Sequence, residues 1–82
     1  MDIAELFRNN LRRIRESAGL SQAELSRRMG HGTNYVCGLE RGRDGRAPSV
    51  ETIGSVAQAL GVDADELFRP TKQKSKKSAK RS

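Results

Sequence analysis

The sequence predicts an all-α domain. Its apolar residues recur at intervals of three and four, a glycine follows most apolar stripes, and no segment alternates between apolar and polar residues with a period of two. The chain has 82 residues, of which 34% are hydrophobic and 4% aromatic, so it can build one modest core. We expect five short helices with tight loops in a folded domain over residues 1–69, followed by a disordered basic tail over residues 70–82.

The first two predicted helices are marked by their ends. Gly19 suits the left-handed conformation found beyond a helix C-terminus, so the first helix covers residues 3–18. Ser21 and Glu24 have the spacing of a capping box, which starts a second helix that Gly30 ends. The apolar stripes are Ile3, Phe7, Leu11, Ile14 and Ala18 in the first helix, and Leu25 and Met29 in the second.

Three further helices follow from the same kinds of signal. The third covers residues 33–41 and is closed by Gly42, and the fourth begins after Ser49 and ends at Gly61. Residues 63–68 form a last short helix, because acidic residues in a first turn complement the positive end of the helix dipole. The apolar residues are Val36 and Leu39 in the third helix, Val50, Ile53, Val56, Ala57 and Leu60 in the fourth, and Leu67 and Phe68 in the fifth.

The net charge is confined to the end of the chain. Residues 1–69 contain ten Arg, no Lys and ten Asp or Glu, so the whole formal charge of +6 lies in residues 70–82. Such a tail can serve as a solubilising terminus, or as an arm that binds phosphates and raises the affinity for any nucleic acid. Its cations are Lys72, Lys74, Lys76, Lys77, Lys80 and Arg81.

Several classes of protein are excluded by composition. A single Cys rules out an intramolecular disulfide framework and a multi-Cys zinc site, and fits a reducing, cytoplasmic compartment. No apolar run approaches the roughly 20 residues of a membrane span, and the start of the chain lacks a signal-peptide core. With one His and no Gly-rich phosphate loop, we expect neither an enzyme nor a bound metal, cofactor or small-molecule ligand.

The second and third predicted helices, separated by residues 30–32, form a helix-turn-helix unit, whose second helix lies in the major groove of DNA. The characteristic runs are LSQAEL at 20–25, YVCGLERG at 35–42, PS at 48–49, AQALGV at 57–62 and ELF at 66–68. With these runs the chain, from about Leu6 to Phe68, closely resembles the phage-repressor and Cro-type helix-turn-helix domains, which implies a lambda-repressor-like fold. The run at 35–42 is most similar to the controller proteins of restriction–modification systems.

The resemblance implies that the start of the third helix reads bases. An Asn such as Asn34 can pair bidentately with adenine, and Thr33 can offer both its methyl and its hydroxyl group. Cys37 and Gly38 are small, so the approach to the groove is close but poor in hydrogen bonds, and Cys37 is a filler rather than a redox or metal residue. The alternative is an ordinary exposed helix surface. The implied base-reading residues are Thr33, Asn34, Tyr35, Cys37 and Gly38.

The resemblance also implies contacts to the DNA backbone. The N-terminus of the second helix offers free N–H groups and a positive dipole end to a phosphate, and Arg side chains flank the third helix. Solvated polar and Arg side chains are the alternative. The implied phosphate-contacting residues are Ser21, Gln22, Arg41, Arg43 and Arg46. Arg15 and Glu40 match a family ion pair that bridges the first and third helices and holds the recognition helix at its angle.

The predicted function follows from the size of one recognition helix, which reads only a few base pairs. Specific sites are usually bound by dimers whose two helices lie one DNA turn apart, about 34–36 Å. The resemblance implies an interface of Val62, Leu67 and Phe68 with the exposed face of the fourth helix. We expect a homodimeric, autoregulatory transcriptional regulator on an inverted-repeat operator, either a repressor or an activator. Activation would require contact with RNA polymerase, for which acidic residues 63–66 could serve.

Two rival functions remain open from the sequence. An antitoxin of the same fold would neutralise a toxin, although a polar, basic tail is a poor clamp for one. Sequence-neutral binding to nucleic acid, including RNA, would require an aromatic platform, and the chain offers only Phe7, Tyr35 and Phe68.

Overall fold

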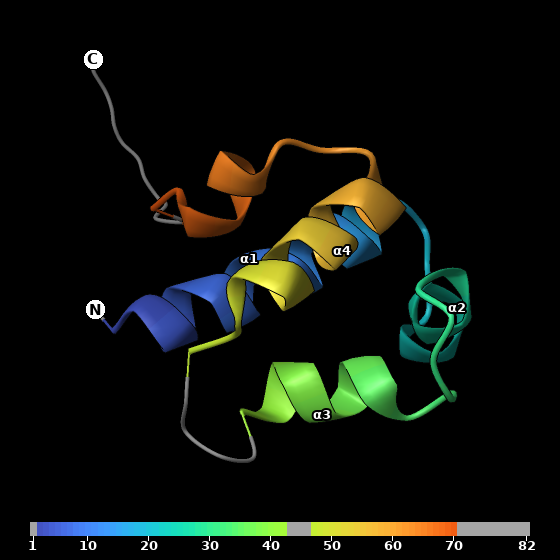
Figure 1. The fold of residues 1–82 in the computed structure, drawn as a ribbon. Helices are drawn as coiled ribbons and strands as arrows, with labels where there is room; N and C mark the ends of the chain where they lie inside the picture. Colours follow the sequence, from blue (N-terminus) through green and yellow to red (C-terminus); the bar gives the residue numbers. More distant parts are fainter. Residues whose placement is uncertain (1, 43–46, 71–82) are drawn as a thin grey trace.

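The fold is all-α, as predicted. The computed structural model describes residues 2–42 and 47–70, and these residues contain no β-strand. Within the described residues four α-helices are followed by a short 3₁₀ helix, arranged as in Figure 1, so the expected count of five α-helices is corrected to four. The elements are α1 (Ile3–Ser17), α2 (Gln22–Arg28), α3 (Tyr35–Arg41), α4 (Val50–Leu60) and the 3₁₀ helix η1 (Ala64–Phe68).

Three of the helices begin at a side-chain cap. Asp2 accepts a hydrogen bond from the Ala4 N–H at the start of α1, and Ser49 does the same for Thr52 in α4. The predicted capping box of α2 is present: the Glu24 N–H donates to Ser21 Oγ at 3.0 Å, and the Ser21 N–H donates to Glu24 Oε1 at 2.8 Å. These bonds satisfy N–H groups that have no partner within the helix, and so fix where each helix starts.

Helix α3 begins two residues later than the sequence predicts. Thr33 and Asn34 form a turn, which is closed by a hydrogen bond from the Tyr35 N–H to the Gly32 carbonyl at 3.1 Å. Asn34 is the N-cap residue, but its side chain makes no capping hydrogen bond. The turn between α2 and α3 is therefore longer, and α3 shorter, than the apolar spacing alone indicated.

The last predicted helix is a 3₁₀ helix, and its end is held by α1. The Glu66 N–H donates to the Asp63 carbonyl, which is the i to i+3 pattern of a 3₁₀ turn. The Asn10 amide of α1 donates to the carbonyls of Leu67 at 3.0 Å and of Arg69 at 2.7 Å. These bonds tie the end of η1 to the first helix.

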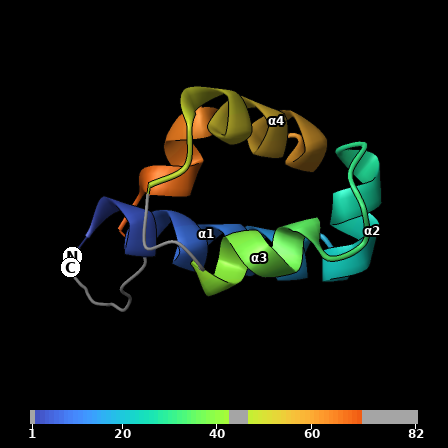
Figure 2. The same cartoon turned by 60° about the horizontal axis from the view of Figure 1, so that its bottom comes forward.

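The core lies where α1 meets the other elements. In Figure 2, α1 and α3 lie side by side beneath α4, and α2 stands across one end of the pair. η1 packs against α1 and α4. This arrangement leaves one long face of α3 outside the bundle. The largest buried apolar side chains are Phe7 and Leu11 of α1, Leu25 of α2, Val36 of α3, Val56 of α4 and Leu67 of η1.

Candidate nucleic-acid interface

Helix α3 has one face in the core and another in solvent. Val36 and Glu40 are buried and face the bundle, whereas Asn34 and Arg41 are exposed. Thr33, in the preceding turn, is also exposed. Between Asn34 and Arg41 this face carries the half-buried Cys37 and Gly38, which project little from the helix backbone.

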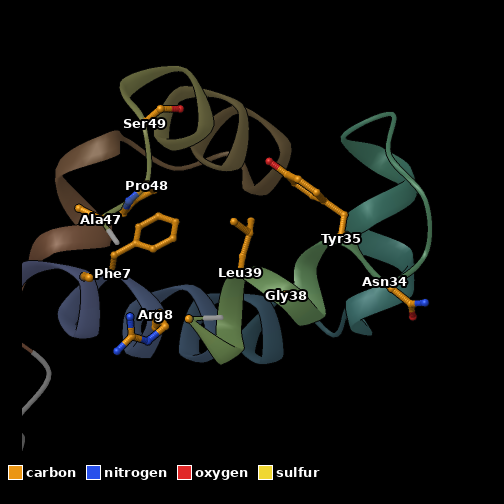
Figure 3. A pocket seen from close by; sticks show the side chains of 11 residues that line it. Phe7, Arg8, Asn34, Tyr35, Gly38, Leu39, Ala47, Pro48 and Ser49 are labelled. Atoms are coloured by element: carbon orange, nitrogen blue, oxygen red, sulfur yellow. The ribbon is translucent and has the colours of Figure 1, made fainter. Parts of the chain in front are cut away.

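Tyr35 departs from the expectation that it projects with its neighbours. Its ring lies with Leu39 on the side of α3 that faces a cleft, and the side chain of Asn34 points in the opposite direction (Figure 3). The ring packs against the core cluster and stacks on the imidazole of His31, with ring centroids 3.7 Å apart and planes inclined by 11°. Tyr35 therefore braces the turn before α3 and is half-buried.

The cleft of Figure 3 has a volume of about 570 Å³ and lies between α1, α3 and the segment that leads into α4. Phe7 and Leu39 line its interior. Arg8 passes over the end of α3, where a Cβ on Gly42 would lie 2.6 Å from the guanidinium. Gly42 has φ +64°, which an L side chain rarely adopts, so the backbone conformation favours glycine here, whereas the flexible Arg8 side chain could move away from a Cβ. Arg8 thereby places a cation beside the C-terminus of α3. The sequence analysis did not identify this residue.

The buried carboxylate of Glu40 joins α1, α2 and α3. Arg15 binds it with two hydrogen bonds, Nε to Oε2 at 2.6 Å and Nη2 to Oε1 at 3.2 Å, so the structure brings the predicted pair together. Gln22 Nε2 donates to Oε1 at 2.8 Å, and Arg12 Nε lies 3.6 Å from the same oxygen. Arg15 also donates to the Leu20 carbonyl at 2.7 Å. A charged, hydrogen-bonded cluster thus ties α3 to α1 and α2.

Glu40 is ionised at neutral pH. Burial acts to raise the pKa of its carboxyl, but the hydrogen bonds from Arg15 and Gln22 and the charges of Arg15 and Arg12 outweigh that effect and hold the pKa below its ordinary value. The hydrogen bond to Glu40 likewise raises the pKa of Arg15. Gln22 was expected to contact a DNA phosphate, but in the structure its amide nitrogen donates a hydrogen bond to Glu40.

Two buried polar residues escaped the sequence analysis. Asn10 follows Phe7 by three residues and Ser26 precedes Met29 by three, so both fall on inward faces of their helices. The Asn10 amide nitrogen donates to a carbonyl at the end of η1, and its oxygen accepts from Arg13. The Ser26 hydroxyl donates to the Gln22 carbonyl of its own helix and accepts from the Val36 N–H of α3. A polar residue at an inward register position is the signal that could have found them.

The residues expected at a dimer interface differ in exposure. Leu67 is 0% exposed and lies in the chain's own core, so its expected place on a partner-facing surface is corrected. Phe68 and Val62 are half-buried, and the Phe68 ring centroid lies 6.0 Å from that of Phe7. On α4, by contrast, Val50 is 83% exposed. The remaining exposed residues of α4 are Glu51, Gly54, Ser55 and Gln58.

Some of the expected phosphate contacts can be located and others cannot. Ser21 and Arg41 are exposed, at the start of α2 and the end of α3. Arg43 and Arg46, and the tail cations Lys72, Lys74, Lys76, Lys77, Lys80 and Arg81, lie outside the described residues.

Over residues 2–42 and 47–70, no group of three or more His, Cys, Asp or Glu side chains is close enough to hold a metal ion. Within the same part of the chain, no helix has the length and apolar character needed to cross a membrane.

Residues 11–67 match the helix-turn-helix family, and the chain therefore belongs to this family of DNA-binding transcription regulators. Over 71 residues it is 45% identical to the uncharacterized HTH-type transcriptional regulator y4dJ of Sinorhizobium fredii, covering 87% of this chain and 90% of the relative.

Two crystal structures have a similar fold. The hypothetical transcription factor NHTF from Neisseria is 36% identical, with a TM-score of 0.76 over 85% of this chain and 78% of the other. The restriction-modification controller protein C.AhdI from Aeromonas hydrophila is 38% identical, with a TM-score of 0.69 over 79% of this chain and 96% of the other. The predicted resemblance is thus confirmed: the chain is a helix-turn-helix transcriptional regulator with a controller-protein-like structure.

Proposed function

We propose that this regulator binds a specific double-stranded operator as a homodimer, with α3 of each copy in the major groove. The observation that carries the proposal is the division of α3 into two faces. Its inner face is fixed by the buried Glu40 cluster, while Arg41 at its end and Thr33 and Asn34 in the preceding turn are exposed. Direct readout of base edges requires a rigid helix that carries short polar side chains at its N-terminal end.

Base reading is assigned to the start of α3. Asn34 is free of capping bonds, so its amide can pair with an adenine, and Thr33 can contact a thymine methyl group. The small residues Cys37 and Gly38 let the helix approach the base edges closely. Tyr35, whose ring lies on the cleft side, contributes at the edge of this contact.

Backbone binding is assigned to a set of cations and polar groups around α3. Ser21 and Arg41 are exposed at suitable ends of their helices, and Gln22 links the phosphate-facing end of α2 to Glu40. The remaining contacts belong to cations beyond the described residues. These contacts supply affinity that depends on salt and hardly on sequence. The proposed additional contacts are Arg43, Arg46 and the basic residues of the tail.

Dimerisation is assigned to the exposed face of α4 with Val62 and Phe68. Val50 is the most exposed large apolar residue of that helix, and burial of its side chain against a second copy would contribute hydrophobic free energy to dimerisation. Two recognition helices about one DNA turn apart would then read an inverted repeat. Regulation of the protein's own gene, by occluding RNA polymerase or by contacting it through acidic residues 63–66, completes the proposal.

Footprinting on DNA upstream of the protein's own gene tests the proposal. We expect a protected inverted repeat, and protection that rises more steeply with protein concentration than binding by a monomer would allow. A variant with both Thr33→Ala and Asn34→Ala is the control, because it keeps the surrounding cations and loses the base-reading groups. Protection that is equal for the variant and the parent, or equal on random duplex at the same salt concentration, would refute sequence-specific readout.

A further inference from the structure

Helix α3 differs from the other α-helices in how its first turn is capped. Asp2, Ser21 and Ser49 each accept a backbone N–H of the helix that they begin. Asn34, the N-cap of α3, has φ −98° and ψ 4° instead of the extended conformation of those three caps, and its side chain makes no such bond. Asn is nevertheless among the best N-cap residues, because its side-chain oxygen can accept from the second or third helical N–H.

The bond that Asn34 could make is made by Ser26 of α2 instead. Val36 is the second residue of α3, and its N–H donates to Ser26 Oγ at 2.9 Å. The Ser26 hydroxyl donates its own proton to the Gln22 carbonyl at 2.8 Å, which leaves the oxygen free to accept from Val36. Both Ser26 and Val36 are 0% exposed, so water cannot replace this bond.

Ser26 also controls the turn that precedes α3. Its backbone carbonyl accepts a hydrogen bond from the His31 N–H at 2.9 Å. The carbonyl therefore holds the entry to the turn, and the hydroxyl holds the first turn of α3. One residue on the inner face of α2 thus fixes both ends of the segment that contains Thr33 and Asn34.

We propose that Ser26 is a positioning residue for DNA readout: by capping α3 from the neighbouring helix, it releases the Asn34 amide for contact with a base. The proposal rests on the assignment of Asn34 to base reading. Without the Ser26 hydroxyl, the buried Val36 N–H has no partner, and the Asn34 side chain can supply one once its backbone adopts the extended conformation of the other three caps. An inward Asn34 is lost to the groove.

A double-mutant cycle on the full chain tests the proposal. Ser26→Ala is introduced with Asn34 present and again with Asn34→Ala, and the dissociation constants for the footprinted operator and for random duplex are measured at fixed salt. With Asn34 present, we expect Ser26→Ala to weaken operator binding about tenfold, the scale of a single base-specific interaction, with little change on random duplex. In the Asn34→Ala background we expect a change below about twofold. Equal losses in both backgrounds, or no loss in either, would overturn the proposal.

A stability control separates positioning from general weakening. Val56→Ala truncates a buried side chain of α4 and also lowers stability. All variants are compared at a temperature at which each is fully folded. The ratio of operator to random-duplex affinity should fall for Ser26→Ala and stay constant for Val56→Ala; a parallel fall in both would count against a positioning role.

A measurement without DNA distinguishes failure of this proposal from failure of the proposed function. NMR couplings of the free protein report the χ1 rotamer of Asn34. Ser26→Ala should shift Asn34 toward the rotamer that caps the Val36 N–H, and an unchanged rotamer would overturn the proposal. If no operator can be found but the rotamer shifts, base reading by Asn34 fails while the capping relation stands.

Discussion

The buried ion pair of α1 and α3 makes a quantitative prediction for Glu40→Gln. The Glu40 side chain is 1% exposed and accepts two hydrogen bonds from Arg15, so the substitution leaves a buried guanidinium without its counter-charge. Removing one partner of such a pair typically costs about 3–5 kcal/mol. A domain of this size has about 4–12 kcal/mol of stability, and 1 kcal/mol shifts its melting temperature by about 4–8 °C. We therefore expect Tm to fall by at least about 12 °C.

Urea and thermal unfolding followed by circular dichroism measure this change. The matched control is Glu16→Gln, because Glu16 lies 3.8 Å from the same Arg15 but is 62% exposed. That exposed pair should contribute less than about 1 kcal/mol. If Glu40→Gln costs no more than Glu16→Gln, the pair does not hold α3 in place, and the reasoning from burial is wrong.

The same pair predicts the pH dependence of stability. Because the pKa of Glu40 is lowered on folding, its contribution is complete above the pKa of the unfolded chain, near 4.3, and is lost as the pH falls through the lower folded value. The difference in unfolding free energy between the parent and Glu40→Gln should therefore be constant at neutral pH and shrink below about pH 4. A difference that grows on acidification would contradict the sign of this shift.

Three further predictions concern binding and assembly. Thr33→Ala with Asn34→Ala should abolish the preference for operator while leaving weak, salt-sensitive binding, as measured by titration against operator and random duplex; unchanged operator affinity would remove these residues from base readout. Deleting residues 70–82 should weaken binding to all duplexes alike. The slope of log K against log salt concentration should become smaller in magnitude by about 0.9 for each phosphate that the tail neutralises. Equal slopes for the two proteins would show that the tail does not bind DNA. Val50→Asp should give folded monomers by sedimentation and Leu67→Asp an unfolded chain by circular dichroism, because only Leu67 lies in the core; a dimeric Val50→Asp would place the interface elsewhere.

The ends of the elements could be predicted from the sequence because they depend on local chemistry. The capping box of Ser21 and Glu24 needs only neighbouring residues, as does the left-handed glycine at position 61 that ends α4. The start of α3 was misplaced because its cap comes from Ser26, on another helix. No spacing rule within residues 33–41 contains that information.

The candidate site shows the same division between local and long-range information. The outward face of α3 follows from the inward positions of Val36 and Leu39 in the sequence pattern. Periodicity identified Leu67 as an apolar, packed residue, but it cannot distinguish the chain's own core from the surface of a second copy. The part played by Gln22 was hidden because its amide meets Glu40, eighteen positions away in sequence.

The Asn10 amide connects the two ends of the folded chain, and this has a consequence for synthesis on the ribosome. Asn10 is made early, but its carbonyl partners on Leu67 and Arg69 follow 57 and 59 residues later. Until those residues leave the exit tunnel, the amide and the adjoining apolar face of the first helix must stay in water or with a chaperone. The contacts of the first helix are therefore completed only after position 69 has left the tunnel, and a nascent chain stalled before that position lacks the finished core that supports α3.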